Sequence, residues 1–355
     1  MKTNFTNLGM LAMAIIVIAS CKKDQMIDDG GIVVTRNYKN GYFVTNEGNF
    51  GTGNGSISFV RNEVEVENDV FKSINSFALG DVVQSMNIIG DNAYILVNGS
   101  SKIEVASIDS LRSVATIDGL VSPRYMAEVS GLKAYVTDWG VNGVQVIDLE
   151  TNTVSSTITC GTGAEGIAVS NGFAYVCNVG SWGLDNTVTI IDIITDAVVT
   201  TLEVGDKPNS VVVDANASVW VLTGGNTEYD ENWNTVSETA GNLVKIVDNT
   251  IVASYVFAVG NHPEDLVIND DGTTLYYSDG NWTKAVYKFD ISDIALSDTA
   301  FINKSFYGLG CSNGFIYGTD AVDFTQSGWS FKYTTSGTIV DSVQIGIIPG
   351  GYCFN

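Results

Sequence analysis

The residues of this chain that could bind a ligand are mainly aromatic and amide side chains. Four of the six tryptophans lie in polar segments outside the valine- and isoleucine-rich ones, namely Trp139, Trp182, Trp233 and Trp282. Large aromatic rings in such segments offer rigid contact area and lose little rotamer freedom on binding. Asn and Gln amides both donate and accept hydrogen bonds, which suits a ligand with many amides of its own. This combination indicates ligand binding without catalysis.

Acid–base and metal chemistry have few candidate residues. The single histidine, His262, lies in the segment NHPE at residues 261–264. A zinc triad or a Ser-His-Asp site would therefore depend on that one residue, and the H-E-x-x-H and G-x-x-x-x-G-K-[ST] motifs are absent. His262 could act as a base beside Glu264, but a solvated turn residue is the simpler interpretation. We therefore expect no enzyme, no metal and no cofactor.

The charge balance excludes one class of partner. The chain carries 17 Lys and Arg against 40 Asp and Glu, so its formal net charge is −23 and its pI is about 4.1. Such a surface repels phosphate backbones, which argues against nucleic acid. The cysteines after the N-terminal segment are scattered without C-x-x-C spacing, so they indicate buried free thiols and leave one disulfide open; they are Cys160, Cys177, Cys311 and Cys353.

The N-terminus has the pattern of a secretory leader. Residues 1–20 contain the basic Lys2 and an apolar stretch at 8–18. The order Ile-Ala-Ser-Cys at residues 18–21 resembles a bacterial lipobox, which implies that Cys21 is acylated. An ordinary signal peptide with a chance cysteine is the alternative. Residues 21–39 then read as a lipidated tether, and their acidic stretch resembles the surface-export signal of Bacteroidetes lipoproteins. The expected location is the outer membrane, lipid-anchored and exposed on the cell surface.

A strand-like segment that ends in Asn, Asp or Thr recurs seven times along the chain. The copies end at Asn46, Asn98, Asp138, Asn178, Thr223, Asp279 and Asp320, roughly 40–56 residues apart. Most lead into a second apolar strand, such as residues 143–148, then a turn and a β-branched strand, such as residues 154–158. Four short strands per repeat predict an all-β, seven-bladed propeller of four-stranded blades over residues 40–355.

The two ends of the repeat region complement each other. The first copy, residues 42–46, lacks the strand that precedes the other copies, and residues 347–354 repeat that strand with nothing after it. The C-terminal strand should therefore join the first blade and close the ring. Closure would hide two sheet edges that otherwise invite aggregation.

Propeller geometry also predicts a binding face. The corner before the first strand of each blade and the loop after the second strand open on the same face. The insert at residues 224–241 is longer than a hairpin needs. Since Asn, Asp and Gly also form ordinary turns, these residues could instead fold their own loops. The candidate ligand-binding residues are Asn46, Glu47, Asn49, Phe50, Gln84, Asn98, Arg124, Tyr125, Asp138, Trp139, Asn178, Trp182, Asn209, Trp233, Asn281, Trp282, Tyr307, Asp320, Asp323 and Phe324.

Two resemblances add a specific expectation. The strands at residues 134–138 and 174–178 resemble the YVTN type of β-propeller. The corner segments resemble the surface-exposed propeller lipoproteins of Bacteroidetes, at residues 46–50, 80–86, 122–125, 307–309 and 343–350. The latter resemblance implies capture of vitamin B12 (cobalamin) or another corrinoid, which is carried as a ligand and passed to a TonB-dependent outer-membrane transporter. A glycan-binding or protein-scaffold propeller is the alternative, and a propeller lyase or hydrolase is the less favoured one.

Overall fold

The computed structural model describes residues 26–27, 33–34, 38–61, 65–280 and 284–355, which belong to two units. In the unit Met1–Asn37, β1 (Met26–Ile27) pairs antiparallel with β2 (Val33–Val34). The expected signal peptide, Cys21 and most of the tether lie outside the described residues. Within the described part of the chain, no helix combines the length and apolar character needed to cross a membrane.

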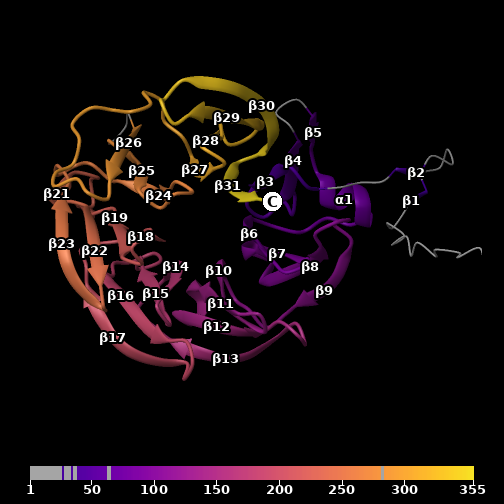
Figure 1. Cartoon of the computed structure of the whole chain (residues 1–355), viewed down its shortest axis with the longest axis horizontal. Coiled ribbons are helices and arrows are strands. Elements are labelled where there is room, and N and C mark those ends of the chain that lie inside the picture. Colours follow the sequence, from indigo (N-terminus) through magenta and orange to yellow (C-terminus); the bar gives the residue numbers. More distant parts are fainter. Residues whose placement is uncertain (1–25, 28–32, 35–37, 62–64, 281–283) are drawn as a thin grey trace, which may run out of the picture. The chain divides into compact units, whose positions relative to one another are not determined.

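The unit Tyr38–Asn355 is a ring of seven antiparallel sheets, or blades (Figure 1). Blade 1 has β31 (Pro349–Phe354), β3 (Gly41–Asn46), β4 (Ser56–Arg61) and β5 (Glu65–Glu67). Blade 2 has β6 (Val83–Ile89), β7 (Asn92–Val97), β8 (Lys102–Ser107) and β9 (Ser113–Ile117). Blade 3 has β10 (Pro123–Ser130), β11 (Lys133–Asp138), β12 (Gly143–Asp148) and β13 (Thr153–Thr159). Blade 4 has β14 (Ala164–Ser170), β15 (Phe173–Asn178), β16 (Thr187–Asp192) and β17 (Ala197–Glu203).

The remaining blades complete the circle. Blade 5 has β18 (Pro208–Val213), β19 (Val219–Thr223), β22 (Asn242–Val247) and β23 (Thr250–Val256). Blade 6 has β24 (Glu264–Ile268), β25 (Thr274–Asp279) and β26 (Ala285–Asp290). Blade 7 has β27 (Gly308–Ser312), β28 (Phe315–Asp320), β29 (Ser327–Thr334) and β30 (Ile339–Ile347). The first strands of the blades contact one another in a closed circle around the axis. The predicted seven-bladed propeller is confirmed.

Blade 6 differs in its outer strand. Among the described residues its sheet has three strands, and a single bridge between Val286 and Ile302 occupies the place of the fourth. Val286 and Ile302 each donate a backbone hydrogen bond to the other's carbonyl, at 2.9 and 3.1 Å. The segment 291–301 between these strands forms turns instead of an extended edge.

Burial explains why these sequences form stacked sheets. The second strands are buried along nearly their whole length, as in β11 and β15, because neighbouring blades cover both of their faces. One apolar cluster joins Leu96 and Ile103 of blade 2 to Ala134 and Val136 of blade 3. The outer strands are mostly exposed to solvent, as β13 is. The core is therefore a circular series of interfaces between blades.

The C-terminal strand closes the ring as predicted. Strand β31 pairs antiparallel with β3, with Val44 opposite Tyr352 and Phe43 opposite Cys353. The rings of Tyr42 and Tyr352 lie 5.8 Å apart, and Tyr42 also contacts Tyr317 of blade 7 at 4.9 Å. The closing strand is thus hydrogen-bonded within blade 1 and packed against blade 7.

One backbone feature recurs at the corners of the loop-bearing face. In four blades, the residue before the first strand has a positive φ: Val82 (54°), Gly163 (66°), Lys207 (55°) and Ile348 (51°). Its carbonyl accepts a hydrogen bond of 2.8 or 2.9 Å from the first amide after the second strand of the same blade. The pairs are Val82 with Asn98, Gly163 with Val179, Lys207 with Gly224 and Ile348 with Glu47. These bonds hold corner and loop together on one face, which therefore presents both.

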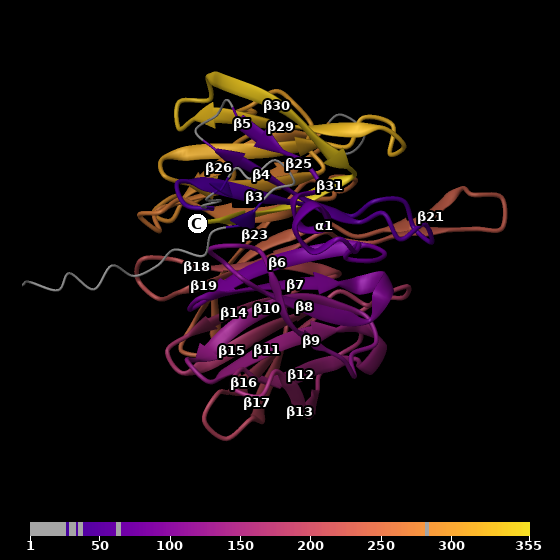
Figure 2. The same cartoon turned by 90° about the vertical axis from the view of Figure 1, so that its right-hand side faces the viewer.

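A short helix, two 3-10 turns and one hairpin lie outside the blade sheets. Helix α1 (Val70–Asn75) packs beside blade 1, and the 3-10 turns η1 (Asn98–Ser100) and η2 (Trp139–Val141) follow second strands. The long insert of blade 5 folds as a hairpin of β20 (Thr227–Tyr229) and β21 (Thr235–Glu238). Figure 2 shows this hairpin projecting beyond the rest of the ring on one side.

Candidate functional site

A cavity of about 860 Å³ opens on the loop-bearing face, over blades 1 to 4 and blade 7. Its lining includes eight of the residues predicted from the sequence, Glu47, Phe50, Gln84, Asn98, Arg124, Trp139, Trp182 and Tyr307. These residues come from corners and loops that are far apart in the chain. The propeller ring is what brings them together.

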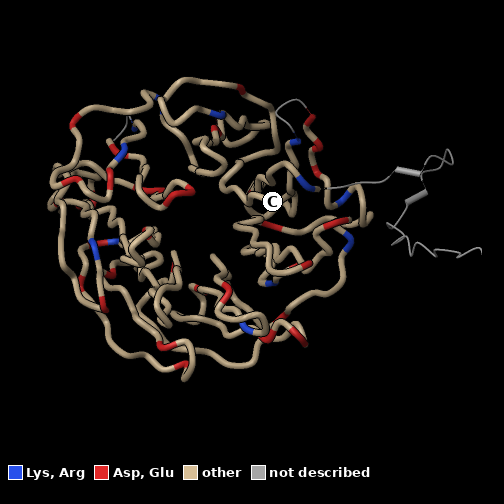
Figure 3. Tube along the Cα trace, in the orientation of Figure 1, with Lys and Arg blue, Asp and Glu red and all other residues tan. Residues whose placement is uncertain are grey.

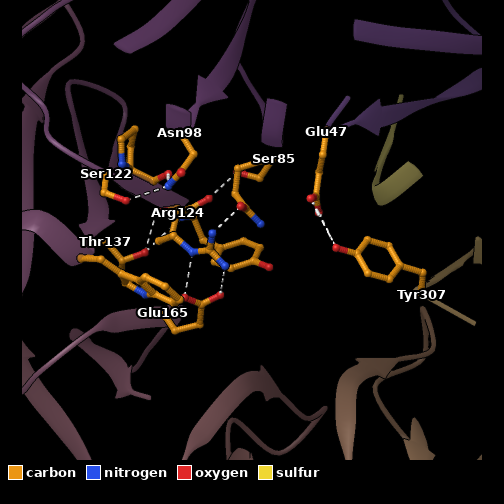
Figure 4. Close-up of polar contacts among 12 residues, drawn as sticks. Glu47, Ser85, Asn98, Ser122, Arg124, Thr137, Glu165 and Tyr307 are labelled. Atoms are coloured by element: carbon orange, nitrogen blue, oxygen red, sulfur yellow. Dashed lines mark hydrogen bonds and ion pairs between the residues drawn. The ribbon is translucent and has the colours of Figure 1, made fainter. Parts of the chain in front are cut away.

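Arg124 organises the floor of this cavity. At the start of β10, its Nε and Nη2 donate to the two carboxylate oxygens of Glu165 on β14, at 2.9 and 2.8 Å (Figure 4). Its Nη1 donates to the side-chain oxygen of Gln84 on β6. Arg124 and Glu165 have little solvent exposure, and a bidentate pair of this kind is well oriented. One guanidinium therefore ties together the first strands of three neighbouring blades.

Aromatic rings extend from this floor towards solvent. The Arg124 guanidinium lies 4.3 Å from the centre of the Trp139 ring, and Trp139 Nε1 donates to Glu165 at 2.6 Å. The ring of Trp182 meets Trp139 edge-on with centroids 6.0 Å apart, yet its residue is 96% exposed. Phe50 is likewise 86% exposed. Two large rings without cover line one open cavity, which is an arrangement suited to binding a broad apolar face.

A second polar pair faces this cluster. The hydroxyl of Tyr307 donates to the carboxylate of Glu47, with distances of 3.1 and 3.3 Å to its two oxygens (Figure 4). Burial raises the pKa of Glu47, against the hydrogen bond from Tyr307 and the charge of Arg124, while Glu165 adds to the increase. Burial and the Glu47 charge also raise the pKa of Tyr307. The cavity thus has a hydrogen-bonded Tyr–Glu pair on one side and a balanced Arg–Glu pair on the other.

A deeper cavity of about 470 Å³ follows the axis between the first strands. It shares Gln84 with the outer cavity and is lined by Tyr125, Asn209, Glu165 and Asp265, among others. The carboxylate of Asp265 has one oxygen with no hydrogen-bond partner, and burial together with Glu264 raises its pKa well above the usual range. Glu165, Glu264 and Asp265 all line this cavity, and Figure 3 shows acidic positions at the inner ends of some blades as well as around the outside of the ring. The channel is therefore acidic.

Three predicted residues at the ends of second strands do not face the cavity. Asn46, Asp138 and Asn178 are fully buried. The amide of Asn178 donates to Thr187 and Thr189 on the adjacent strand, at 2.9 and 3.0 Å. The carboxylate of Asp138 accepts hydrogen bonds of 2.8 Å from three backbone amides. The side-chain amide of Asn46 donates to the hydroxyls of two serines on β4. At these three positions the Asn or Asp is thus a structural cap of the strand, which corrects the ligand-binding interpretation for them.

Another group of predicted residues lies away from the main cavity. Asp320 and Phe324 line a separate hollow of about 450 Å³, where Lys304 pairs with Asp320 at 3.0 Å. Asn49 donates to the Phe324 carbonyl at 2.7 Å, and Asp323 is exposed and caps its own loop. Trp233 is 82% exposed near the tip of the β20–β21 hairpin. Asn281 and Trp282 lie outside the described residues.

His262 stabilises the hairpin of blade 5. Its Nδ1 lies 2.8 Å from the Gly224 carbonyl, and its Nε2 lies 3.1 Å from the Thr227 hydroxyl and 3.3 Å from Glu238. Among the described residues, no group of three or more His, Cys, Asp or Glu side chains could hold a metal ion. The structure has free thiols at all four described cysteines, with pKa values raised by burial, and these are Cys160, Cys177, Cys311 and Cys353.

Sequence reasoning missed several features. The cavity wall includes Val82 and Ile348, whose left-handed backbone carries no mark in the sequence. Sequence reasoning also missed the segment Gly-Cys-Ser-Asn-Gly at residues 310–314, which matches the G-x-S-x-G motif of hydrolases. That motif needs a strand-to-helix turn, but Ser312 ends β27 and a hairpin leads directly to β28. This serine is therefore not in a nucleophile elbow.

Comparison with known proteins identifies a family. The model of the family described as "Domain of unknown function (DUF5074)" matches residues 40–340, almost the whole propeller. The chain belongs to this family. No match to a curated protein was found.

Solved structures share the fold across unrelated activities. A quinonprotein alcohol dehydrogenase-like protein from Bacteroides thetaiotaomicron has a TM-score of 0.66 at 16% identity, covering 91% of this chain and 80% of its own. The periplasmic gluconolactonase of Pseudomonas aeruginosa has a TM-score of 0.65 at 10% identity, covering 88% and 98%. Hydrazine synthase of Kuenenia stuttgartiensis has a TM-score of 0.57 at 14% identity, covering 78% and 92%. At these identities the likeness concerns the propeller fold alone.

Proposed function

We propose that this DUF5074 propeller captures cobalamin or another corrinoid in the cavity on its loop-bearing face, without catalysis. The observation that carries the proposal is the pairing of exposed aromatic rings, Trp182 and Phe50, with a polar floor in one open cavity of about 860 Å³. A corrinoid is broad and flat and is rimmed with amides. The rings can cover its face while the floor meets its rim.

The hydrogen-bonding groups on the floor favour a ligand without net negative charge. Arg124 has five N–H donors, of which three are committed to Glu165 and Gln84. Two donors are left for acceptors such as amide carbonyls. Because Glu165 already balances the Arg124 charge and the chain carries −23 overall, an anion gains little here. Neutral carboxamides match this floor better than carboxylates do.

The location and partner form a further part of the proposal. Acylation of Cys21 would anchor the propeller to the outer membrane, and the captured ligand would pass to a TonB-dependent transporter. Replacing Cys21 with Ala should move the protein from the membrane fraction to the soluble fraction while the propeller keeps its melting temperature. Continued membrane association of that variant would contradict the anchor.

Calorimetry of the soluble propeller, residues 38–355, with cyanocobalamin tests the function. We expect saturable binding with one site per chain, accompanied by quenching of tryptophan fluorescence. Arg124→Lys keeps the positive charge but loses the planar guanidinium and its bidentate hydrogen bonds, so it should weaken cyanocobalamin binding. Arg112→Lys, at an exposed position, should not. No heat and no quenching at ligand concentrations well above the protein concentration would reject corrinoid capture.

A glycan is the second candidate, and Trp182 gives it specific support. The almost fully exposed Trp182 ring can stack on a sugar ring, and the Tyr307–Glu47 pair across the same cavity can bind sugar hydroxyls. Retardation in a polysaccharide-containing gel, together with silence in the cobalamin titration, would favour this candidate. Cobalamin binding without retardation would favour corrinoid capture.

A further inference from the structure

Two residues of the cavity wall hold an unfavourable backbone conformation. Val82 and Ile348 have φ values of 54° and 51°, although both are β-branched. In this left-handed region the Cβ atom crowds the following carbonyl, so β-branched residues are rare there and Gly, Asn or Asp is usual. Both residues line the main cavity, Val82 half-buried and Ile348 with 9% of its surface exposed.

The fold fixes this conformation and does not let it relax. The Val82 carbonyl accepts from Asn98 N and the Ile348 carbonyl accepts from Glu47 N, both at 2.8 Å. The donors belong to the loops that carry Asn98 and Glu47 into the cavity. A change of φ at either corner would break the bond that positions one of these loops.

Equivalent corners show that a β-branched residue is not a requirement of the fold. Blade 4 has Gly163 and blade 5 has Lys207 at the same hydrogen-bonded position. At Gly163 a Cβ atom would lie 2.2 Å from the backbone nitrogen of Ser181, so glycine is needed there. At Lys207 a straight-chain side chain is accommodated, and it is not part of the cavity lining.

At both corners where the residue is β-branched, that residue also lines the main cavity. A third β-branched residue with positive φ, Val322 (57°), lies in the loop after β28 and lines the separate hollow. Strain of this kind is retained where the surroundings determine it, and it gathers at binding sites. We propose that Val82 and Ile348 are specificity-determining residues, whose branched side chains contact the apolar part of a bound ligand at the expense of local backbone stability. The proposal rests on ligand capture in this cavity. Together with Phe50 they give blades 1 and 2 an apolar flank, while blades 3 and 4 contribute Trp139 and Trp182.

Glycine substitutions separate binding from folding at these corners. Val82→Gly and Ile348→Gly remove the strained side chains, and Lys207→Gly makes the same change outside the cavity. We expect melting temperatures near the wild-type value for Val82→Gly and Lys207→Gly, since glycine adopts this conformation freely. Ile348→Gly should melt lower, because the Ile348 side chain is buried and its packing is lost. Cyanocobalamin affinity should fall by about tenfold in the first two variants and stay within about twofold in the third.

A further variant distinguishes lost contact from a loosened loop. Val82→Asn keeps a residue that tolerates the left-handed conformation but makes the side chain polar. Its affinity should fall as in Val82→Gly, while its melting temperature stays at the wild-type value. Wild-type affinity in Val82→Asn or in both glycine variants would overturn the inference. So would a fall in melting temperature in Val82→Gly that Lys207→Gly does not show, because the Val82 side chain would then serve folding.

Failure of corrinoid capture itself has a different readout. If the wild type does not bind cyanocobalamin, the proposed function is rejected, and the same variants are titrated with Nile red, a neutral planar dye. Weaker dye binding by Val82→Gly and Ile348→Gly than by Lys207→Gly would still support an apolar contact role in the cavity. Equal dye binding by all three would reject it.

Discussion

The carboxylate of Glu165 binds the guanidinium of Arg124 through two hydrogen bonds of 2.8 and 2.9 Å that join the first strands of blades 3 and 4. The same carboxylate accepts from Trp139 at 2.6 Å. Glu165 therefore links blade packing to the aromatic wall of the cavity. Disturbing this residue should affect both stability and binding.

Removing one member of the Arg124–Glu165 pair should destabilise the propeller. Arg124→Met leaves a poorly solvated carboxylate without its partner, which typically costs about 3–5 kcal/mol. Adding Glu165→Leu to that variant should recover part of the loss. Urea unfolding measures both effects. The exposed pair Lys72–Asp69, at 3.9 Å, provides the control, since Asp69→Asn should change stability by less than about 1 kcal/mol. Equal effects at the two sites would contradict the assigned role of Glu165.

Trp182→Ala should weaken ligand binding by about 1–3 kcal/mol without changing the melting temperature. The ring is almost fully exposed, so the folded chain loses little when it is removed, whereas a ligand stacked on it loses a central contact. Trp233→Ala is the matched control, because that residue is also largely exposed, at 82% against 96%, but lies outside the cavity lining. If both variants bind cyanocobalamin with wild-type affinity, the contact lies elsewhere.

Titration of Glu47 should make stability depend on pH. Burial raises its folded-state pKa above 4.5, with Tyr307 and Arg124 opposing and Glu165 adding to the increase. The folded chain therefore binds this proton more tightly than the unfolded chain, and its stability falls as pH rises from about 4.5 through the raised pKa. The Glu47→Gln variant has no titrating carboxyl group at this position, so it does not show this loss of stability. The unfolding free energy of the wild type minus that of the variant should decrease over this window and then level off. A difference that increases with pH would show the opposite shift.

Deleting residues 352–355 should lower the melting temperature strongly and expose apolar surface. The deletion removes most of the pairing between β31 and β3, together with the aromatic contacts of Tyr352 and Phe354 with Tyr42. Shortening the β20–β21 hairpin by residues 227–238 deletes more chain but leaves every blade intact, so it should have little effect. Similar melting temperatures for both deletions would contradict closure by the C-terminal strand.

The fold could be predicted because its determinants are periodic. Alternation of apolar segments and turns gave the seven repeats, and the missing first strand of blade 1 predicted the role of residues 349–354. The irregular outer edge of blade 6 was not predictable in this way. There a single bridge at Ile302 replaces a strand, and no periodic pattern marks it.

The site was predicted only in part, for physical reasons. Trp182 and Phe50 were found because aromatic rings in polar loops have few structural uses. Asn46, Asp138 and Asn178 were misassigned because a side chain that caps a strand and one that binds a ligand have the same chemistry. The contribution of Val82 depends on its backbone torsion, which the residue type disfavours.

Closure by β31 makes the synthesis of residues 349–354 a condition for a closed ring. Until these residues are available, Tyr42 to Asn46 form a strand with one unpaired edge, however well the intervening blades have packed. A translation product that lacks β31 would expose this unpaired strand edge, which can pair with strands of other molecules. Chaperones and proteases should recognise such fragments, so that molecules with β31 in place dominate the folded population.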